Sequence, residues 1–124
     1  MRKVILIFGS VLIVGIVALL IIRQAYKGSP DYNYLTAKLD IKNKNAGIVN
    51  IGLRKTSSKD KETDSIEAEY GFKNIYVGYD TTKQIISGIS NYNEVMEAYL
   101  KLRNGINWKE NYQRQVDSLN KISN

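Results

Sequence analysis

The chain has 124 residues, and its 18 lysines and arginines exceed its 12 acidic residues, for a formal net charge of +6. This length suits a single domain. Cysteine and histidine are both absent, which excludes disulfides, thiol nucleophiles, lipid-bearing cysteines, Cys/His zinc sites and imidazole bases. With 44% apolar residues, the chain is not of disordered composition.

The first predicted element is an apolar helix near the N-terminus. Residues 4–22 carry no charge, and 15 of these 19 are Val, Ile, Leu or Phe. A helix of that length spans about 28 Å, close to the roughly 30 Å hydrocarbon core of a bilayer. We therefore predict a membrane anchor over residues 1–27 with its transmembrane helix at 4–22. Its basic and aromatic flanks are expected at the headgroups, namely Arg2, Lys3, Arg23, Tyr26 and Lys27.

An uncleaved signal anchor is favoured over a cleaved signal peptide. The apolar run exceeds the roughly 7–15 residues of a signal peptide, and no small-residue cleavage pattern follows it. If cleavage does occur, the remainder is a secreted domain. Basic residues are nearly equal in number before and after the apolar helix, so they do not fix its orientation. However, long domains translocate largely regardless of charge, and a short basic N-terminal segment usually stays in the cytoplasm. We expect a single-pass protein whose C-terminal domain is extracytoplasmic.

The rest of the chain is predicted to be a linker, residues 28–34, and a small α+β domain, residues 35–124. The linker contains Pro30, the one proline. Apolar and polar residues alternate over residues 35–41, which predicts a half-buried strand. Residues 49–53 alternate again after a turn, so the second strand would return antiparallel. We expect a two- or three-stranded antiparallel sheet and a C-terminal helix pair.

The following segments complete this expected fold. A short helix is predicted at 65–70, with Asp64 as N-cap and Gly71 after its end, although its alternation would equally suit a strand. Residues 72–79 are predicted to form a strand with Ile75, Val77 and Tyr79 on one face. Apolar spacings of three and four predict helices at 85–102 and 107–122.

The sequence contains few groups that could carry out chemistry. No activated-nucleophile motif, phosphate-binding glycine pattern or metal-ligand pattern is present, so we predict no enzyme activity, no cofactor and no metal site. Glu67 with Glu69 is the carboxylate pair that a hydrolase of the cell envelope would need, and this is the alternative function. Glu67 is better explained as a residue near a helix N-terminus.

The charge belongs mostly to the anchor. Four basic residues flank the apolar helix, and residues 28–124 contain 14 basic and 12 acidic side chains, a net charge of +2. We therefore expect no nucleic-acid partner. Most of the nine tyrosines occupy apolar positions, but Tyr34 and Tyr76 are expected to be exposed and to form a partner surface. The predicted function is a non-enzymatic binding or accessory module of the bacterial cell envelope, with the lipid bilayer and a membrane protein complex or envelope component as partners.

Overall fold

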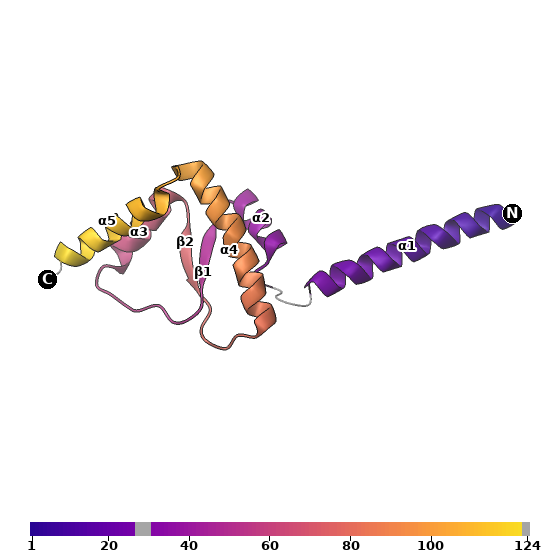
Figure 1. The fold of residues 1–124 in the computed structure, drawn as a ribbon, viewed down its shortest axis with the longest axis horizontal. Coiled ribbons are helices and arrows are strands. Elements are labelled where there is room, and N and C mark those ends of the chain that lie inside the picture. Colours follow the sequence, from indigo (N-terminus) through magenta and orange to yellow (C-terminus); the bar gives the residue numbers. More distant parts are fainter. Residues whose placement is uncertain (27–30, 123–124) are drawn as a thin grey trace.

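The computed structural model describes residues 1–26 and 31–122. Within these ranges the protein is mostly helical, with five helices and one two-stranded parallel sheet (Figure 1). The elements in chain order are α1 (Arg2–Tyr26), α2 (Tyr34–Lys42), β1 (Gly47–Asn50), α3 (Asp60–Tyr70), β2 (Lys73–Tyr76), α4 (Lys83–Asn104) and α5 (Trp108–Ile122).

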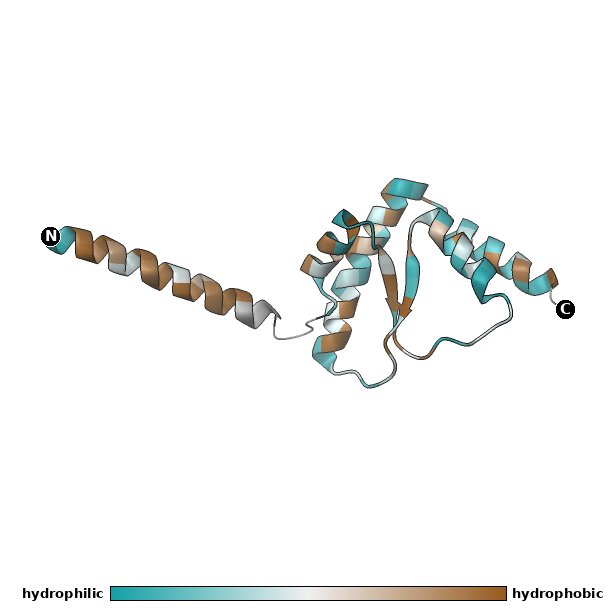
Figure 2. Cartoon of the chain, turned by 180° about the vertical axis from the view of Figure 1, so that it is seen from behind, coloured by the Kyte–Doolittle hydropathy of each residue, from teal (hydrophilic) through white to brown (hydrophobic). Residues whose placement is uncertain are grey.

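The first helix, α1, is apolar along nearly its whole length (Figure 2). Its residues from Arg2 to Ile22 are exposed, and this stretch is long and apolar enough to cross a membrane, as a signal sequence would also be. Arg23 and Tyr26 belong to its last turn, and Lys27 lies outside the described residues.

The strand pairing differs from the predicted antiparallel sheet. β1 and β2 are parallel, with Gly47 opposite Lys73 and Asn50 opposite Tyr76. A parallel pair needs a crossover between its strands, and α3 lies within that connection. The predicted α+β class with an antiparallel hairpin is therefore wrong, because the first predicted strand is a helix and the second pairs with a strand beyond α3.

The segment predicted as the first strand forms α2, because its N-terminus is capped. The Asn33 side-chain oxygen accepts the backbone N–H groups of Leu35 and Thr36 at 2.9 and 3.0 Å. Thr36 Oγ1 in turn accepts the backbone N–H of Asn33 at 2.8 Å, which completes a capping box. The helix begins at Tyr34, inside the range predicted as linker.

The alternating apolar residues of this segment fall on two different faces of α2. Ala37 is fully buried and Ile41 packs against the same core. Leu35 and Leu39 remain exposed, because residues two apart on a helix project in nearly opposite directions. The alternation in the sequence therefore arises because apolar residues lie on both the buried and the exposed face of this helix.

The other predicted helices are present with changed bounds. α3 begins at Asp60, so Asp64 lies inside the helix and is not its N-cap. Gly71 ends α3 in the left-handed conformation with φ of 81°, as predicted. The two C-terminal helices are confirmed as α4 and α5, and Gly105, with φ of 99°, ends α4.

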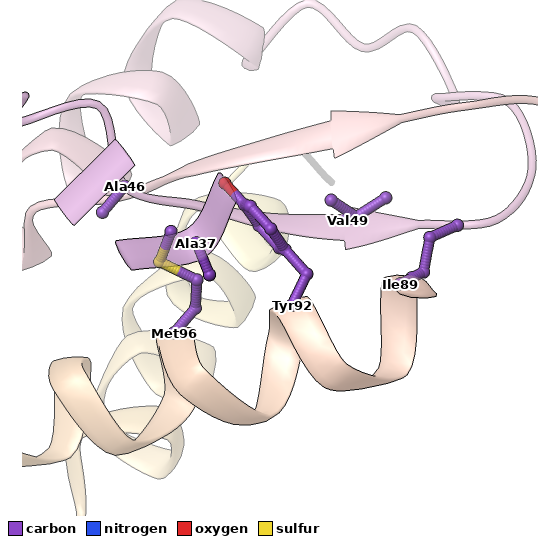
Figure 3. Packing of buried hydrophobic residues seen from close by; sticks show 6 residues of the cluster. All are labelled: Ala37, Ala46, Val49, Ile89, Tyr92 and Met96. Atoms are coloured by element: carbon purple, nitrogen blue, oxygen red, sulfur yellow. The ribbon is translucent and has the colours of Figure 1, made fainter. Parts of the chain in front are cut away.

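The sheet lies between α2 and α4 on one side and α3 and α5 on the other (Figure 1). The first core cluster joins α4 to β1 and α2, as Figure 3 shows; its buried members are Ala37, Ala46, Val49, Ile89, Tyr92 and Met96. The second contains Phe72, Leu100 and Trp108 and joins α4 to α5. Ile48 and Tyr99 pack against both clusters, so the core is continuous.

Candidate functional site

The two faces of the sheet have different chemistry. Alternate residues of a strand point to opposite faces. Val49 and Ile75, which are opposite each other, belong to the first core cluster. The cross-strand neighbours on the other face are Ile48 with Asn74 and Asn50 with Tyr76. This second face is therefore largely polar, although it lies beneath α5.

A buried carboxylate holds this polar face in place. Glu67, on α3, is only 5% exposed. Its Oε2 accepts the backbone N–H of Asn74 at 2.9 Å, and its Oε1 accepts the Asn74 side-chain amide at 2.7 Å. Oε1 also accepts the Tyr112 hydroxyl at 3.3 Å. The three donors satisfy the buried carboxylate, as burial of a charged group requires.

The network continues across the sheet and into α5. Asn50 Nδ2 donates to the side-chain oxygen of Asn74 at 3.0 Å, so the two asparagines link the strands through their side chains. Asn74 Nδ2 lies 3.3 Å from the Tyr112 hydroxyl. Burial, the negative charge of Glu67 and the hydrogen bond to it raise the pKa of Tyr112 to about 12.

A pocket of about 450 Å³ opens over this face, between the sheet and the helices α4 and α5. Its side chains are mostly amides and aromatic rings, together with Ile48 and Val49. They include Asn50, Asn74, Tyr76, Asn93, Trp108, Tyr112 and Gln113. Trp108 is buried, whereas Tyr76 is 42% exposed and accessible to a ligand. Amide and hydroxyl groups beside aromatic rings suit a ligand with both hydrogen-bonding groups and an apolar surface.

The two charged side chains that line this pocket neutralise each other. Glu97, on α4, forms an ion pair with Lys109, on α5, at 2.9 Å. Both side chains are solvent-exposed and contribute little to stability. In the described ranges, no group of three or more His, Cys, Asp and Glu side chains could hold a metal ion. The arrangement can therefore bind a neutral polar ligand by hydrogen bonds and ring contacts.

The structure does not bring Glu67 and Glu69 together as a carboxylate pair. Glu67 is buried and points to β2, whereas Glu69 is exposed. Residues two apart on a helix project about 200° apart, so the two carboxylates cannot face one substrate. Glu67 also lies in the second half of α3, away from the N-terminus that its predicted capping role requires.

Of the two predicted surface tyrosines, one lies at the pocket. Tyr34 and Tyr76 are both exposed, but Tyr34 belongs to α2 and lines a different groove. Tyr79, predicted to share the buried face of Ile75, is 75% exposed because β2 ends at Tyr76. Sequence reasoning missed Asn50 and Asn74. Their signal is that asparagine is depleted in strands, yet each lies beside a valine or isoleucine in a strand.

No protein-family model matches the chain, and no curated protein or solved structure is significantly similar to it. The chemistry of the pocket and of the apolar helix is therefore the basis for assigning a function.

Proposed function

We propose that the chain is a non-enzymatic, membrane-anchored binding module of the bacterial cell envelope and that it binds its ligand in the pocket over the sheet. The observation that carries this proposal is the polar face fixed by the buried Glu67. Side chains that are already held by hydrogen bonds lose little conformational freedom on binding, which favours affinity.

The pocket chemistry favours a glycan of the envelope as the ligand. Sugars offer many hydroxyl groups and apolar C–H faces, which match side-chain amides and exposed aromatic rings. Tyr76 supplies an exposed ring, and Asn50 lies opposite it on the neighbouring strand. Glu97 and Lys109, the charged side chains that line the pocket, pair with each other and leave no unpaired exposed charge to select a strongly acidic or basic ligand.

α1 is the anchor in this proposal, and the domain lies outside the cytoplasm. Support comes from the length and apolar character of Arg2–Ile22 and from the tendency of long domains to translocate regardless of charge. Alkaline phosphatase and a fluorescent protein, each fused to the C-terminus, test the orientation. An active phosphatase and a dark fluorescent fusion are expected, and the reverse pattern would overturn the orientation. The mass of the mature protein distinguishes the retained anchor from a secreted domain released by cleavage.

Binding is tested with the full chain in detergent or nanodiscs, titrated with N-acetylated glycan oligosaccharides from cell wall. Replacing Tyr76 or Asn50 by Ala is expected to weaken binding about tenfold, which corresponds to about 1.4 kcal/mol. Tyr79→Ala is the matched control, because this tyrosine is exposed near the end of the same strand but does not line the pocket. Absence of glycan binding, or an equal loss in all three variants, would count against the pocket as a glycan site.

The positions of Glu67 and Glu69 do not support the hydrolase alternative. It needed two carboxylates on either side of a substrate bond, and the pair that the sequence offered does not converge. We therefore do not retain it as a second candidate.

A further inference from the structure

The helix α2 has one face that the rest of the domain leaves uncovered. At 3.6 residues per turn, five of its nine side chains fall within an arc of about 140°. All five are exposed, and they are Tyr34, Leu35, Lys38, Leu39 and Lys42. We call these residues the α2 face. Ala37 and Ile41 lie outside this arc and pack in the core.

This face combines large apolar side chains with positive charge. Tyr34, Leu35 and Leu39 are 54%, 45% and 56% exposed. Lys38 and Lys42 lie between the tyrosine and the two leucines around the helix, and Lys38 Nζ is 5.3 Å from the centroid of the Tyr34 ring. The face contains no acidic residue. Lysines beside large apolar groups can lay their apolar stems along a membrane interface and place their charges at lipid phosphates.

The apolar surface extends beyond α2. A groove of about 660 Å³ separates α2 from α4, and Leu102 on its far side is 89% exposed. Most of the residues that line this groove are aliphatic or aromatic, and Glu94 is the acidic one. Tyr34 and Lys38 of the α2 face also line this groove, so the groove borders the face on its tyrosine side.

The chain itself holds the α2 face close to the end of α1. Seven residues separate Tyr26, the last residue of α1, from Tyr34, the first residue of α2. Even a fully extended connection of that length spans less than about 30 Å. A helix tethered so closely to a membrane-spanning segment has a high effective concentration at the bilayer surface, so weak contacts suffice to hold it there.

We propose that the α2 face lies on the surface of an anionic lipid bilayer. This inference rests on the proposed function, because it needs α1 to be retained in the membrane. Tyr34, Leu35 and Leu39 enter the boundary between headgroups and acyl chains, while Lys38 and Lys42 extend along it to lipid phosphates. A two-fold dimer through this face is disfavoured, since it would bring the lysines of two copies together.

The experiment uses the full chain reconstituted into vesicles, with one fluorescent label per variant. The sequence contains no cysteine, so a single introduced cysteine gives a unique labelling site. Leu39→Cys reports on the α2 face, and Ser65→Cys on the exposed side of α3 is its control. Leu12→Cys reports whether α1 is inserted. The vesicles contain phosphatidylcholine with or without phosphatidylglycerol, and a nitroxide on the lipid acyl chain quenches labels that enter the bilayer.

The expected result is strong quenching at Leu12 in both vesicles and several-fold more quenching at Leu39 than at Ser65 when phosphatidylglycerol is present. Lys38→Glu with Lys42→Glu should bring the Leu39 signal down to that of Ser65. Quenching at Leu12 but not at Leu39 would overturn the α2 proposal and leave the anchor intact. Shielding of the Leu39 label from aqueous iodide without lipid quenching would also overturn it, in favour of a second copy or another protein. An unquenched Leu12 label would instead overturn the anchor.

Discussion

The side-chain amide of Asn93 pairs with both backbone polar groups of Val49. Its Nδ2 donates to the Val49 carbonyl at 2.8 Å, and its Oδ1 accepts the Val49 N–H at 2.9 Å. In a parallel pair the backbone groups of alternate residues point to the same edge, and those of Val49 point away from β2. Asn93 thus makes the hydrogen bonds that a third strand beside β1 would make. Glu67 does the same for β2 through the backbone N–H of Asn74.

Asn93→Ala is expected to destabilise the protein by about 2–3 kcal/mol, because it leaves a backbone donor and an acceptor of a buried residue without partners. The free energy of unfolding is measured by urea titration of the full chain in detergent, following the fluorescence of Trp108, the one tryptophan. Asn91→Ala is the control, since this exposed asparagine lies on the same helix, and its effect should stay within about 0.5 kcal/mol. Equal effects would show that Asn93 does not support the strand edge.

Glu67→Gln is expected to cost about 2 kcal/mol although it preserves the size of the side chain. Both carboxylate oxygens accept hydrogen bonds from Asn74, and the glutamine amide nitrogen would place a donor against one of these donors. Glu69→Gln makes the same chemical change at an exposed position of the same helix and should be nearly neutral. The same urea titration measures both, and a neutral Glu67→Gln would contradict the anchoring role of the carboxylate.

The Tyr112 hydroxyl should make stability fall at alkaline pH. Its pKa is raised to about 12 by burial and by Glu67, whereas a tyrosine in the unfolded chain titrates near pH 10. The folded state therefore retains the proton that the unfolded state loses, and stability declines as pH rises from about 10 to about 12. By pH 11 the loss attributable to Tyr112 is about 1 kcal/mol.

The check compares wild type with Tyr112→Phe at pH 9 and pH 11. Burial and the hydrogen bond to Asp40 also raise the pKa of Tyr92, so both proteins lose stability, but the variant should lose less. Identical losses in the two proteins would mean that Tyr112 has an ordinary pKa in the folded state.

The parts of the fold that the sequence predicted correctly are those whose pattern has one explanation. The apolar spacings of α4 and α5 extend over many residues and match only a helix. In α2, by contrast, Leu35, Ala37 and Leu39 alternate like a strand, and only the cap between Asn33 and Thr36 indicates a helix. The partner of β1 was not predictable from local pattern, because the pairing spans α3.

The candidate site was harder to predict because its residues, like the strand partners, are far apart in the sequence. Its residues come from β1, β2, α4 and α5, and no short motif links them. Tyr76 was identified because it alternates with apolar neighbours. The role of Glu67 depends on a hydrogen bond to the backbone of the following strand, which a capping interpretation of the sequence does not suggest.

Gly71 offers a test of how the end of α3 is formed. Its φ of 81° is strained for any other residue, and an added Cβ would lie 0.9 Å from a guanidinium nitrogen of Arg103. Gly78 is the matched control, because its φ is 78° and nothing lies within 4 Å of its added Cβ. Each Gly→Ala variant should lose about 1–2 kcal/mol from backbone strain alone.

The difference between the two variants isolates the contact with Arg103. This side chain is long, exposed and able to move aside, so Gly71→Ala should exceed Gly78→Ala by less than about 0.5 kcal/mol. Combining Gly71→Ala with Arg103→Ala should remove that small excess and leave the strain, because no change of a neighbouring side chain alters φ. A double variant restored to the stability of Arg103→Ala alone would show that crowding, and not the left-handed backbone, explains why glycine occupies the end of α3.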